Sequence, residues 1–423
     1  MQLHSLLLFL SLQLFFSPVI LYAQAFQPTA EPRLRELPPG IVVERSIVVP
    51  DNDLGLIGNK LGGRIARLSN NFLRVHGRSI QVNFITSSDE ANATAIEKSL
   101  EKIKRKPFVQ RQNQLVVEFV GRDIDEALAL KSAYELGVLP KPTEITYEVK
   151  AELALIDKAN YMSCNPLFLA FLQAERDEVN GAKQVEKLSN QFVFGNSLKL
   201  RSPDSQPVSS IYWTPEPKNQ IKQGVITIYE FDTPAQRYGV PFVPVVLKLI
   251  VDNDGLLPSE DIPAPEMLHS TKYWPATDPA IVRLANSITQ NAETNDEKVT
   301  AILKWLSPGS NIKYSGQTGS RYGTEQVLKQ KFGHCWDFSD LFVTLARASG
   351  VPTRQVAGWL YGSSGHVWCE YYLEGKGWKQ VDPTGGNELP CEIYHLAYFT
   401  SNDGEMPIVY LNAPVIQILE TKP

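Results

Sequence analysis

The sequence predicts an α+β protein built from three successive regions. Residues 41–200 alternate strand-like and helical patterns, residues 201–257 hold short strands bracketed by prolines, and residues 275–423 open with helices and continue as a strand hairpin. The chain has 423 residues, of which 43% are hydrophobic and 21% charged. This is ordinary globular composition, and the length suits roughly two to three domains, each with its own core.

The charge balance argues against a nucleic-acid partner. The chain carries 41 Lys and Arg against 46 Asp and Glu, a formal net charge of −5, and it holds no large basic block. Nucleic-acid binding depends on clustered positive charge that neutralises phosphates. We therefore exclude nucleic acid as a partner at this point.

The first 25 residues predict export. They contain no Asp, Glu, Lys or Arg, and an apolar run over 6–23 ends at Ala23-Gln24-Ala25, a small-x-small pattern. This indicates a signal peptide at 1–25, cleaved after Ala25. The apolar run is also long enough to stay uncleaved as a single anchor, the one case in which we expect membrane contact. Either form places the folded part outside, so we expect a secreted or periplasmic protein.

The next segment, 26–40, carries four prolines and is predicted to be a linker. An α/β domain of unknown role then follows over 41–200. Its strands are expected at 41–49, 80–85 and 115–120, and its helices at 57–72, 90–104, 124–136, 167–178 and 182–192.

The composition changes near residue 201. Prolines bracket three β-rich runs, which predict a small antiparallel unit over 201–257 with strands at 209–213, 225–231 and 242–251. A second proline cluster follows, and helices at 281–289 and 296–306 then open the region 275–423.

The motif with the clearest chemistry is a cysteine at the start of a helix. Gly333-His334-Cys335 precedes apolar residues spaced as on one helix face, and Gly350-Val351-Pro352 ends the run. A helix over 335–349 therefore holds Cys335 in its first turn. Unpaired backbone N–H groups and the helix dipole favour a thiolate there. Gly333 permits close backbone approach just before the cysteine.

A histidine and an aspartate follow on a predicted hairpin. Residues 354–360 form a strand, a Gly/Ser loop spans 361–365, and the hairpin runs over 366–383. A turn centred on Glu374 would place His366 directly opposite Asp382, with Cβ atoms about 5 Å apart. Such a thiol, imidazole and carboxylate suit nucleophilic acyl transfer: Cys335 attacks, His366 moves the proton, and Asp382 fixes the imidazole tautomer.

Three further residues are candidates for substrate binding. Trp336 is the tryptophan expected to line the cleft, whereas the other tryptophans nearby (Trp359, Trp368 and Trp378) are expected to be core packing. The backbone N–H of Cys335 is a natural oxyanion donor. The second donor stays open, with Gln317 and Tyr322 upstream within plausible reach.

The remaining cysteines and histidines indicate no cofactor. Four cysteines are too few for a disulfide scaffold. If Cys335 stays a free thiol, at most one bridge can form among Cys164, Cys369 and Cys391, and Cys369 with Cys391 is the least implausible pair. Cys369 lies three residues after His366, which predicts that it faces the other side of the strand and is buried. The histidines His76, His269 and His395 have no sequence neighbours at metal-ligand spacing, so we predict no metal, no calcium and no other cofactor.

The region 275–423 resembles the transglutaminase-like superfamily. The matching pieces run from Gly333 to Phe338, over the helix to Arg354, and through His366-Val367-Trp368-Cys369-Glu370 and Gly377-Trp378 to Asp382-Pro383-Thr384. The resemblance implies a papain-like core, a helix packed on an antiparallel sheet, and a Cys–His–Asp triad at Cys335, His366 and Asp382.

The expected function is an exported thiol enzyme that acts on protein or peptide amide bonds through a Cys335 acyl-enzyme. The family spans hydrolysis and glutamine–lysine cross-linking, and we favour hydrolysis because no feature marks a lysine channel. The alternatives are a protein-glutamine γ-glutamyltransferase and a non-catalytic binding or assembly module. A functional centre in 41–200 is the last alternative, because that region contains no residues at the spacing of a catalytic motif.

Overall fold

The structure is a computed structural model. It describes residues 32–35, 37, 41–75, 78–104, 107–122, 124–157, 165–195, 197–203, 208–224, 226–252, 256–257, 263–307, 311–316, 319–362, 365–384 and 393–422. The predicted signal peptide at 1–25 lies outside these residues. Among the helices that are described, none combines the length and the apolar character needed to cross a membrane.

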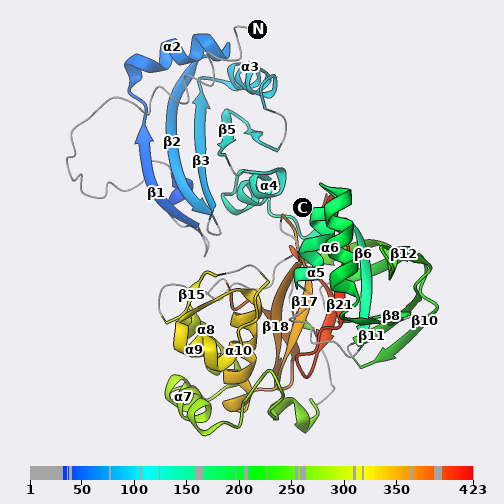
Figure 1. Ribbon diagram of the computed structural model, residues 1–423. Helices are drawn as coiled ribbons and strands as arrows, with labels where there is room; N and C mark the ends of the chain where they lie inside the picture. Colours follow the sequence, from blue (N-terminus) through cyan, green and yellow to red (C-terminus); the bar gives the residue numbers. More distant parts are fainter. Residues whose placement is uncertain are drawn as a thin grey trace.

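The first part of the chain forms an antiparallel sheet with helices on both faces (Figure 1). Helices α2 (Asp51–Leu61) and α3 (Glu90–Glu101) bury apolar side chains against one face, and α4 (Glu126–Glu135) packs on the other. A short 3₁₀ turn, η1 (Pro32–Leu34), precedes the sheet. The strands, in spatial order, are β1 (Ile41–Val48), β2 (Ile65–Val75), β3 (Arg78–Ser87), β5 (Leu115–Val120) and β4 (Val109–Gln112).

The predicted helix over 57–72 is wrong beyond residue 61. Helix α2 ends at Leu61, and Gly62 caps it with φ 75°, a left-handed conformation that costs glycine little. The chain then turns into strand β2, whose residues Leu68, Leu73 and Val75 are buried. Helical spacing of the apolar residues was coincidental, because two glycines at 62 and 63 interrupt it.

The rest of the chain is built on two sheets that share strands from distant parts of the sequence. The first of them, the eight-stranded sheet, has the order β10 (Asn219–Gln223), β11 (Ile226–Asp232), β8 (Ser197–Pro203), β20 (His395–Ser401), β17 (Thr353–Leu360), β18 (Gly365–Leu373), β19 (Gly377–Val381) and β14 (Leu256–Leu257). The seven-stranded sheet comprises β12 (Ala235–Arg237), β13 (Val240–Asp252), β6 (Glu144–Asp157) and β21 (Ile408–Tyr410), with β7 (Val193–Phe194) and β22 (Val415–Lys422) paired to β6 and β9 (Val208–Thr214) paired to β13.

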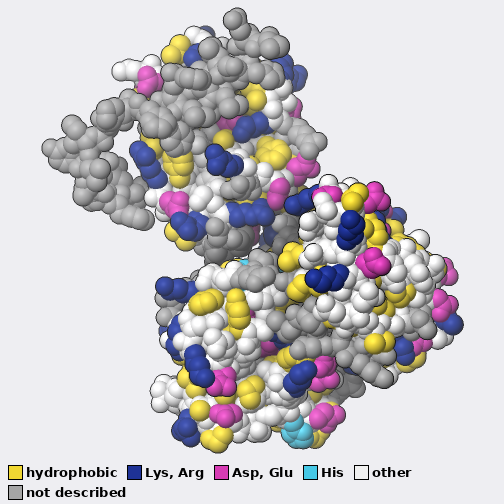
Figure 2. Space-filling model, viewed as in Figure 1, with side chains coloured by type: hydrophobic (Ala, Val, Ile, Leu, Met, Phe, Trp, Pro, Cys, Tyr) yellow, Lys and Arg dark blue, Asp and Glu magenta, His cyan; other side chains and the backbone are white. Residues whose placement is uncertain are grey.

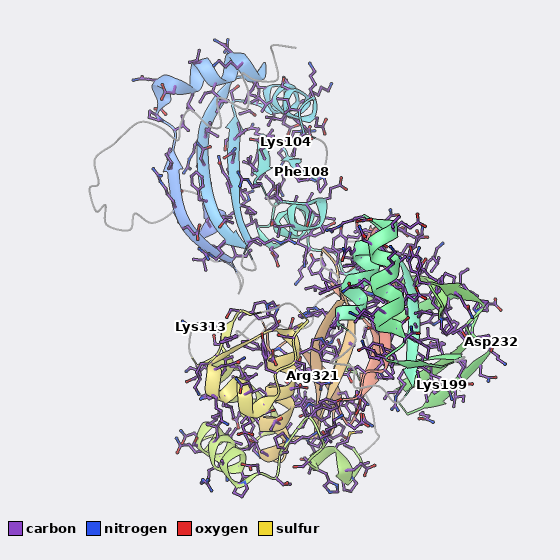
Figure 3. The ribbon with its side chains drawn as sticks, viewed as in Figure 1. Lys104, Phe108, Lys199, Asp232, Lys313 and Arg321 are labelled. Carbon is purple, nitrogen blue, oxygen red and sulfur yellow. The ribbon has the colours of Figure 1, made fainter. Side chains whose placement is uncertain are left out.

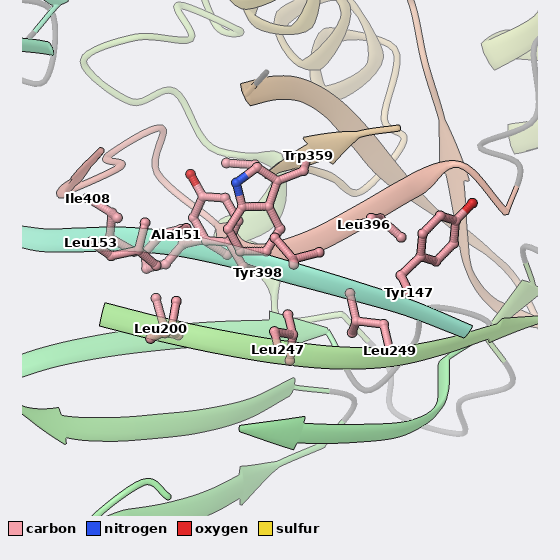
Figure 4. Close-up of a cluster of buried hydrophobic side chains, with 14 of the residues drawn as sticks. Tyr147, Ala151, Leu153, Leu200, Leu247, Leu249, Trp359, Leu396, Tyr398 and Ile408 are labelled. Carbon is pink, nitrogen blue, oxygen red and sulfur yellow. The ribbon is translucent and has the colours of Figure 1, made fainter. Parts of the chain in front are cut away.

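These two sheets pack face to face and enclose the largest hydrophobic cluster (Figure 4). Strand β6 supplies Tyr147 and Leu153, and both are fully buried. Trp359 of β17 and Leu396 of β20 meet them from the eight-stranded sheet. Helices α5 (Asn165–Ala174) and α6 (Glu178–Ser189) pack near the end of the seven-stranded sheet in a separate cluster.

Two sequence-based expectations about this region need correction. Strand β6 was not predicted, although its alternate residues from Ile145 to Leu153 are buried as a sheet face requires. The strands predicted for 201–257 are present, but they do not form a sheet of their own. They are divided between the two sheets: β9 and β13 lie in the seven-stranded sheet, where β13 also pairs with β6, and β11 lies in the eight-stranded sheet between β10 and β8. Both sheets include strands from outside 201–257.

Four helices open the C-terminal region and build a second core. Helix α7 (Pro279–Thr289) is capped by Asp278, and α8 (Asn295–Leu306) by a capping box of Thr294 and Glu297. They pack with α9 (Thr324–Gln330) against the apolar side of α10 (Cys335–Ala348). The connecting elements are η3 (Pro265–Leu268), β15 (Lys313–Tyr314) and β16 (Phe332–Gly333).

A buried ion pair fixes α10 to its surroundings. Arg321 donates from Nε and Nη2 to the two carboxylate oxygens of Asp340, at 2.5 and 2.6 Å, and Trp274 donates to Asp340 at 2.8 Å. Figure 3 shows Arg321 inside the C-terminal part. Because both charges are 1% exposed, loss of either partner would leave the other unpaired in a dry interior.

Candidate active site

The first feature of the site is Cys335 at the start of α10. The helix is preceded by His334 in extended conformation, so Cys335 occupies the first helical position, as predicted. Its side chain is 8% exposed. The unpaired N–H groups of this first turn and the helix dipole favour negative charge on its sulfur.

Asp337 holds this helix start in place. Its carboxylate accepts a hydrogen bond from the backbone N–H of His334 at 3.0 Å and another from that of Tyr322 at 2.6 Å. Burial raises the pKa of Asp337 to about 6, although both backbone bonds oppose the shift. Gly333 is required for this packing, because a Cβ there would lie 2.5 Å from that of Asp337. The predicted close approach at Gly333 is thereby confirmed.

His366 lies between Asp382 and Cys335. Its Nε2 is 2.8 Å from Oδ2 of Asp382, and the Cys335 side chain is near enough to interact with the ring. Burial alone would lower the pKa of His366, but Asp382 and Cys335 outweigh it and raise this pKa to about 10. Burial would in turn raise the pKa of Asp382, but the two histidines at its carboxylate hold it well below the usual range. The arrangement therefore favours an imidazolium beside a carboxylate.

The hairpin register differs from the prediction by two residues. Leu373 pairs with Gly377, so the turn centres on Gly375 rather than Glu374. Gly375 has φ 70°, which glycine adopts at little cost. A shift of two residues preserves the face of the strand, so Asp382 still reaches His366, diagonally rather than from the directly opposite position.

His395 is a site residue that sequence reasoning missed. It begins β20, and its Nε2 lies 3.2 Å from the same Oδ2 of Asp382 that His366 contacts. Its ring also packs edge-on against Trp368, with centroids 5.1 Å apart. The signal in the sequence is a histidine directly before the apolar and aromatic run Leu-Ala-Tyr-Phe, but only the pairing of β20 with β17 brings it to Asp382.

These side chains also form the one group of donor atoms, among the described residues, with metal-ligand proximity. The ligand atoms of His366, Asp382 and His395 lie within 4.8 Å of one another. Two imidazoles and a carboxylate are ligands that zinc accepts. His395 therefore has such neighbours in the folded structure, although the spacing in the sequence indicates none. Both histidine nitrogens already hydrogen-bond the Asp382 carboxylate.

Tyr314 is a second residue missed from the sequence. It lies on β15, and its ring contacts His334 and Phe338, with centroids 4.6 and 5.8 Å away. Burial and the negative charges of Cys335 and Asp382 raise the pKa of its phenol. The phenol of this partly exposed tyrosine therefore stays neutral and interacts electrostatically with Cys335.

The predicted substrate-binding residues fare differently. Trp336 is 5% exposed and packs in the main core with Arg321 over its ring, so it offers little surface to a substrate, contrary to expectation. Tyr322 is 38% exposed and is tied to Asp337 by its backbone. Gln317 lies outside the described residues.

The predicted roles of the other aromatic and thiol side chains can also be compared. Trp359, Trp368 and Trp378 are buried, as core residues should be. Cys369 is buried, as expected, and is a free thiol that donates to the Ser339 carbonyl at 3.6 Å. Within the part of the chain that the structure describes, it has no disulfide partner. Both Cys391 and Cys164 lie outside the described residues.

A cysteine at a helix start and a His–Asp pair on the adjoining sheet are the arrangement of a transglutaminase-like thiol enzyme. Residues 282–383 match the family model of the transglutaminase-like superfamily. This segment is therefore a transglutaminase-like core, which confirms the family resemblance and the mixed α+β fold class. Geometry and family together support a thiol enzyme in general terms.

Each of the similar proteins described here matches only part of this chain. YebA of Bacillus subtilis, an uncharacterised protein, is 30% identical over 165 residues, which are 33% of this chain and about a fifth (21%) of YebA. A structure from Cytophaga hutchinsonii, described provisionally as a cysteine protease, has 14% identity and a TM-score of 0.38 over 66% of this chain and 92% of that one. The periplasmic domain of TgpA from Pseudomonas aeruginosa has 15% identity and a TM-score of 0.32 over 58% and 91%.

Proposed function

We propose that this chain is an exported thiol enzyme that hydrolyses protein or peptide amide bonds through an acyl-enzyme on Cys335. The observation that supports this most strongly is the His366 ring, which interacts with both the Cys335 side chain and the Asp382 carboxylate. Export rests on the apolar segment at 1–25. The proposed partners are proteins or peptides.

The first half of the reaction forms the acyl-enzyme. The thiolate form of Cys335, paired with protonated His366, attacks the amide carbon, so that a C–S bond forms and the carbonyl electron pair moves to oxygen. The Cys335 backbone N–H faces this oxyanion, and the neutral Tyr314 hydroxyl is the proposed second donor. As Nε2 of His366 is held by Asp382, Nδ1 gives its proton to the leaving amine when the C–N bond breaks.

The second half consumes a water molecule. Neutral His366 takes a proton from water, the hydroxide attacks the thioester carbonyl, and the C–S bond breaks to release a carboxylic acid and the Cys335 thiol. An amine in place of water would instead give a cross-linked product. We favour water because it is the most abundant acceptor outside a cell and no residue pattern here marks a lysine channel.

The proposal is tested by mass spectrometry of a mixed protein substrate after incubation in ¹⁸O-labelled water. Cleaved ends that carry ¹⁸O would support a peptidase, and labelled side-chain carboxylates an amidase. Conjugates that have lost ammonia would instead overturn hydrolysis in favour of γ-glutamyl transfer.

Two variants complete this experiment. Replacement Cys335→Ala should lower product formation at least about 10³-fold. The matched control Cys369→Ala alters a buried thiol outside the site and should retain activity. Identical product patterns for wild type and Cys335→Ala would remove the enzyme interpretation and leave a binding or assembly module.

A further inference from the structure

The carboxylate of Asp382 receives more hydrogen bonds than the proposed reaction requires. Oδ2 faces Nε2 of His366 at 2.8 Å and Nε2 of His395 at 3.2 Å. Oδ1 accepts from the backbone N–H of Thr384 at 3.0 Å and from its hydroxyl at 2.6 Å. Four donors therefore occupy the acceptor sites of one buried carboxylate.

We propose that His395 is a positioning residue, whose Nε2–H holds Asp382 in the orientation that His366 needs. This rests on the proposed function, since it assigns a role within the same reaction. His395 hydrogen-bonds Asp382, and its ring lies beside those of Trp368 and His366, with centroids 5.1 and 5.9 Å away. Its hydrogen bond runs to the carboxylate, so the role we assign to it is exerted through Asp382.

The two histidines at Oδ2 differ in charge. Burial lowers the pKa of His395, and Asp382 opposes this, while His366 and Lys131 lower the pKa further. The pKa of His366, by contrast, is raised to about 10. His395 is therefore a neutral donor beside an imidazolium, and the carboxylate receives an orienting hydrogen bond without a second full positive charge.

The surroundings of Asp382 give the bond its importance. Strand β19 ends at Val381, so Asp382 lies just beyond the last paired residue of the sheet. The backbone hydrogen bonds between β18 and β19 therefore end before Asp382. Hydrogen bonds to the Asp382 carboxylate, from His395 of β20 and from the backbone N–H of Thr384, supply the restraint instead. Supporting hydrogen bonds of this kind hold functional groups in the geometry that a reaction needs.

The experiment compares three substitutions at one position. His395→Gln keeps an N–H donor at similar reach, His395→Met has a similar size but no donor, and His395→Phe keeps the ring against Trp368 without a donor. Loss of a hydrogen bond to a charged group corresponds to about 10- to 100-fold in rate. We expect that loss in kcat, with KM nearly unchanged, for Met and Phe, and recovery of most of the rate for Gln.

A spectroscopic measurement tests positioning independently of catalysis. The N–H proton shared by His366 and Asp382 should give a downfield ¹H resonance in ¹⁵N-histidine-labelled protein, assigned by its absence in His366→Gln. We expect it in wild type and His395→Gln, and its loss or upfield shift in the Met and Phe variants. The exposed His269 provides the control, since His269→Gln should alter neither kcat nor this resonance.

The outcomes separate the two proposals. Unchanged kcat and resonance in His395→Met or His395→Phe would overturn the positioning role. Equal losses in Gln, Met and Phe would overturn it too, since packing alone would then explain the residue. If wild type lacks Cys335-dependent activity but the resonance depends on a donor at 395, the proposed function fails while the role of His395 stands.

Discussion

At the scale of single residues, the site depends on a few buried polar groups whose partners are fixed. Oδ2 of Asp382 faces both His366 and His395, and Asp337 accepts a hydrogen bond at the start of α10, the helix that carries Cys335. Such groups are costly to disturb because a buried donor or acceptor left alone loses its solvation without compensation. Two predictions follow from their charges and bonds.

The pH dependence of stability should reveal the His366–Asp382 ion pair. The folded pKa of His366 is raised to about 10, above the ordinary value of 6.5, so its contribution is fully present below about pH 6.5 and is lost as pH rises through about 10. We expect Asp382→Asn to be much less stable than wild type at pH 6, and the difference in unfolding free energy to shrink by pH 10. Denaturant unfolding at several pH values measures this, and a constant difference would contradict it.

Asp337→Asn should lower the unfolding free energy by about 2–3 kcal/mol. The carboxylate accepts two backbone N–H groups, whereas an amide has one acceptor oxygen and would set its own N–H against a second donor. Urea unfolding measures the change. Glu325→Gln is the matched control, because its ion pair with Lys329 is exposed and should matter by less than about 1 kcal/mol.

At the scale of elements, α4 joins the N-terminal sheet to the loop that precedes His366. Lys131 of α4 donates to the Tyr361 carbonyl at 3.1 Å and lies 4.7 Å from the centre of the Tyr394 ring. Arg78 of β3 donates to the Gly362 carbonyl at 3.2 Å. The turn at 360–362 is thus held from outside the transglutaminase-like core.

Lys131→Met combined with Arg78→Met should therefore slow alkylation of Cys335 by iodoacetamide about 3- to 10-fold, since two partly exposed anchors of the turn are lost. Circular dichroism should show an intact fold. Lys60→Met on α2 removes an exposed lysine far from this contact and should alkylate like wild type. If the double variant also reacts at the wild-type rate, α4 does not order the site.

The elements also mark what sequence alone can predict. Helix α10, its cysteine and the following hairpin were predicted because apolar periodicity and the Gly350-Val351-Pro352 stop are local signals. His395 and Tyr314 were missed because their proximity to the site depends on the pairing of β20 with β17 and of β15 with β16. The two-residue error in register reflects a choice between Glu374 and Gly375 that only the backbone conformation decides.

At the scale of the whole molecule, strands from both halves of the sequence share sheets. Strand β6 pairs with β13 on one side and with β21 and β22 on the other. The face seen in Figure 2 carries basic and acidic side chains interspersed, in keeping with a net charge of −5. Stability is therefore expected to come from the shared core rather than from surface ion pairs.

Deletion of residues 413–423 should destabilise this part of the molecule by several kcal/mol, at about 0.5–1.5 kcal/mol for each lost ladder bond. Hydrogen exchange should accelerate in β6, whose residues from Glu144 to Lys150 pair with β22. Strand β3 lies in the N-terminal sheet and serves as an internal control. Unchanged protection of β6 would show that β22 contributes little.

The pairing of β6 has a consequence for the order in which the enzyme becomes active during synthesis. A chain made from its N-terminus has β6 by residue 157 and Cys335 much later, and β20, which carries His395, and β22 are made after Cys335. Long-range pairings of this kind close slowly and late. A nascent chain that already contains Cys335 therefore lacks His395, and the hydrogen bond that we propose to position Asp382 can form only after β20 has been made.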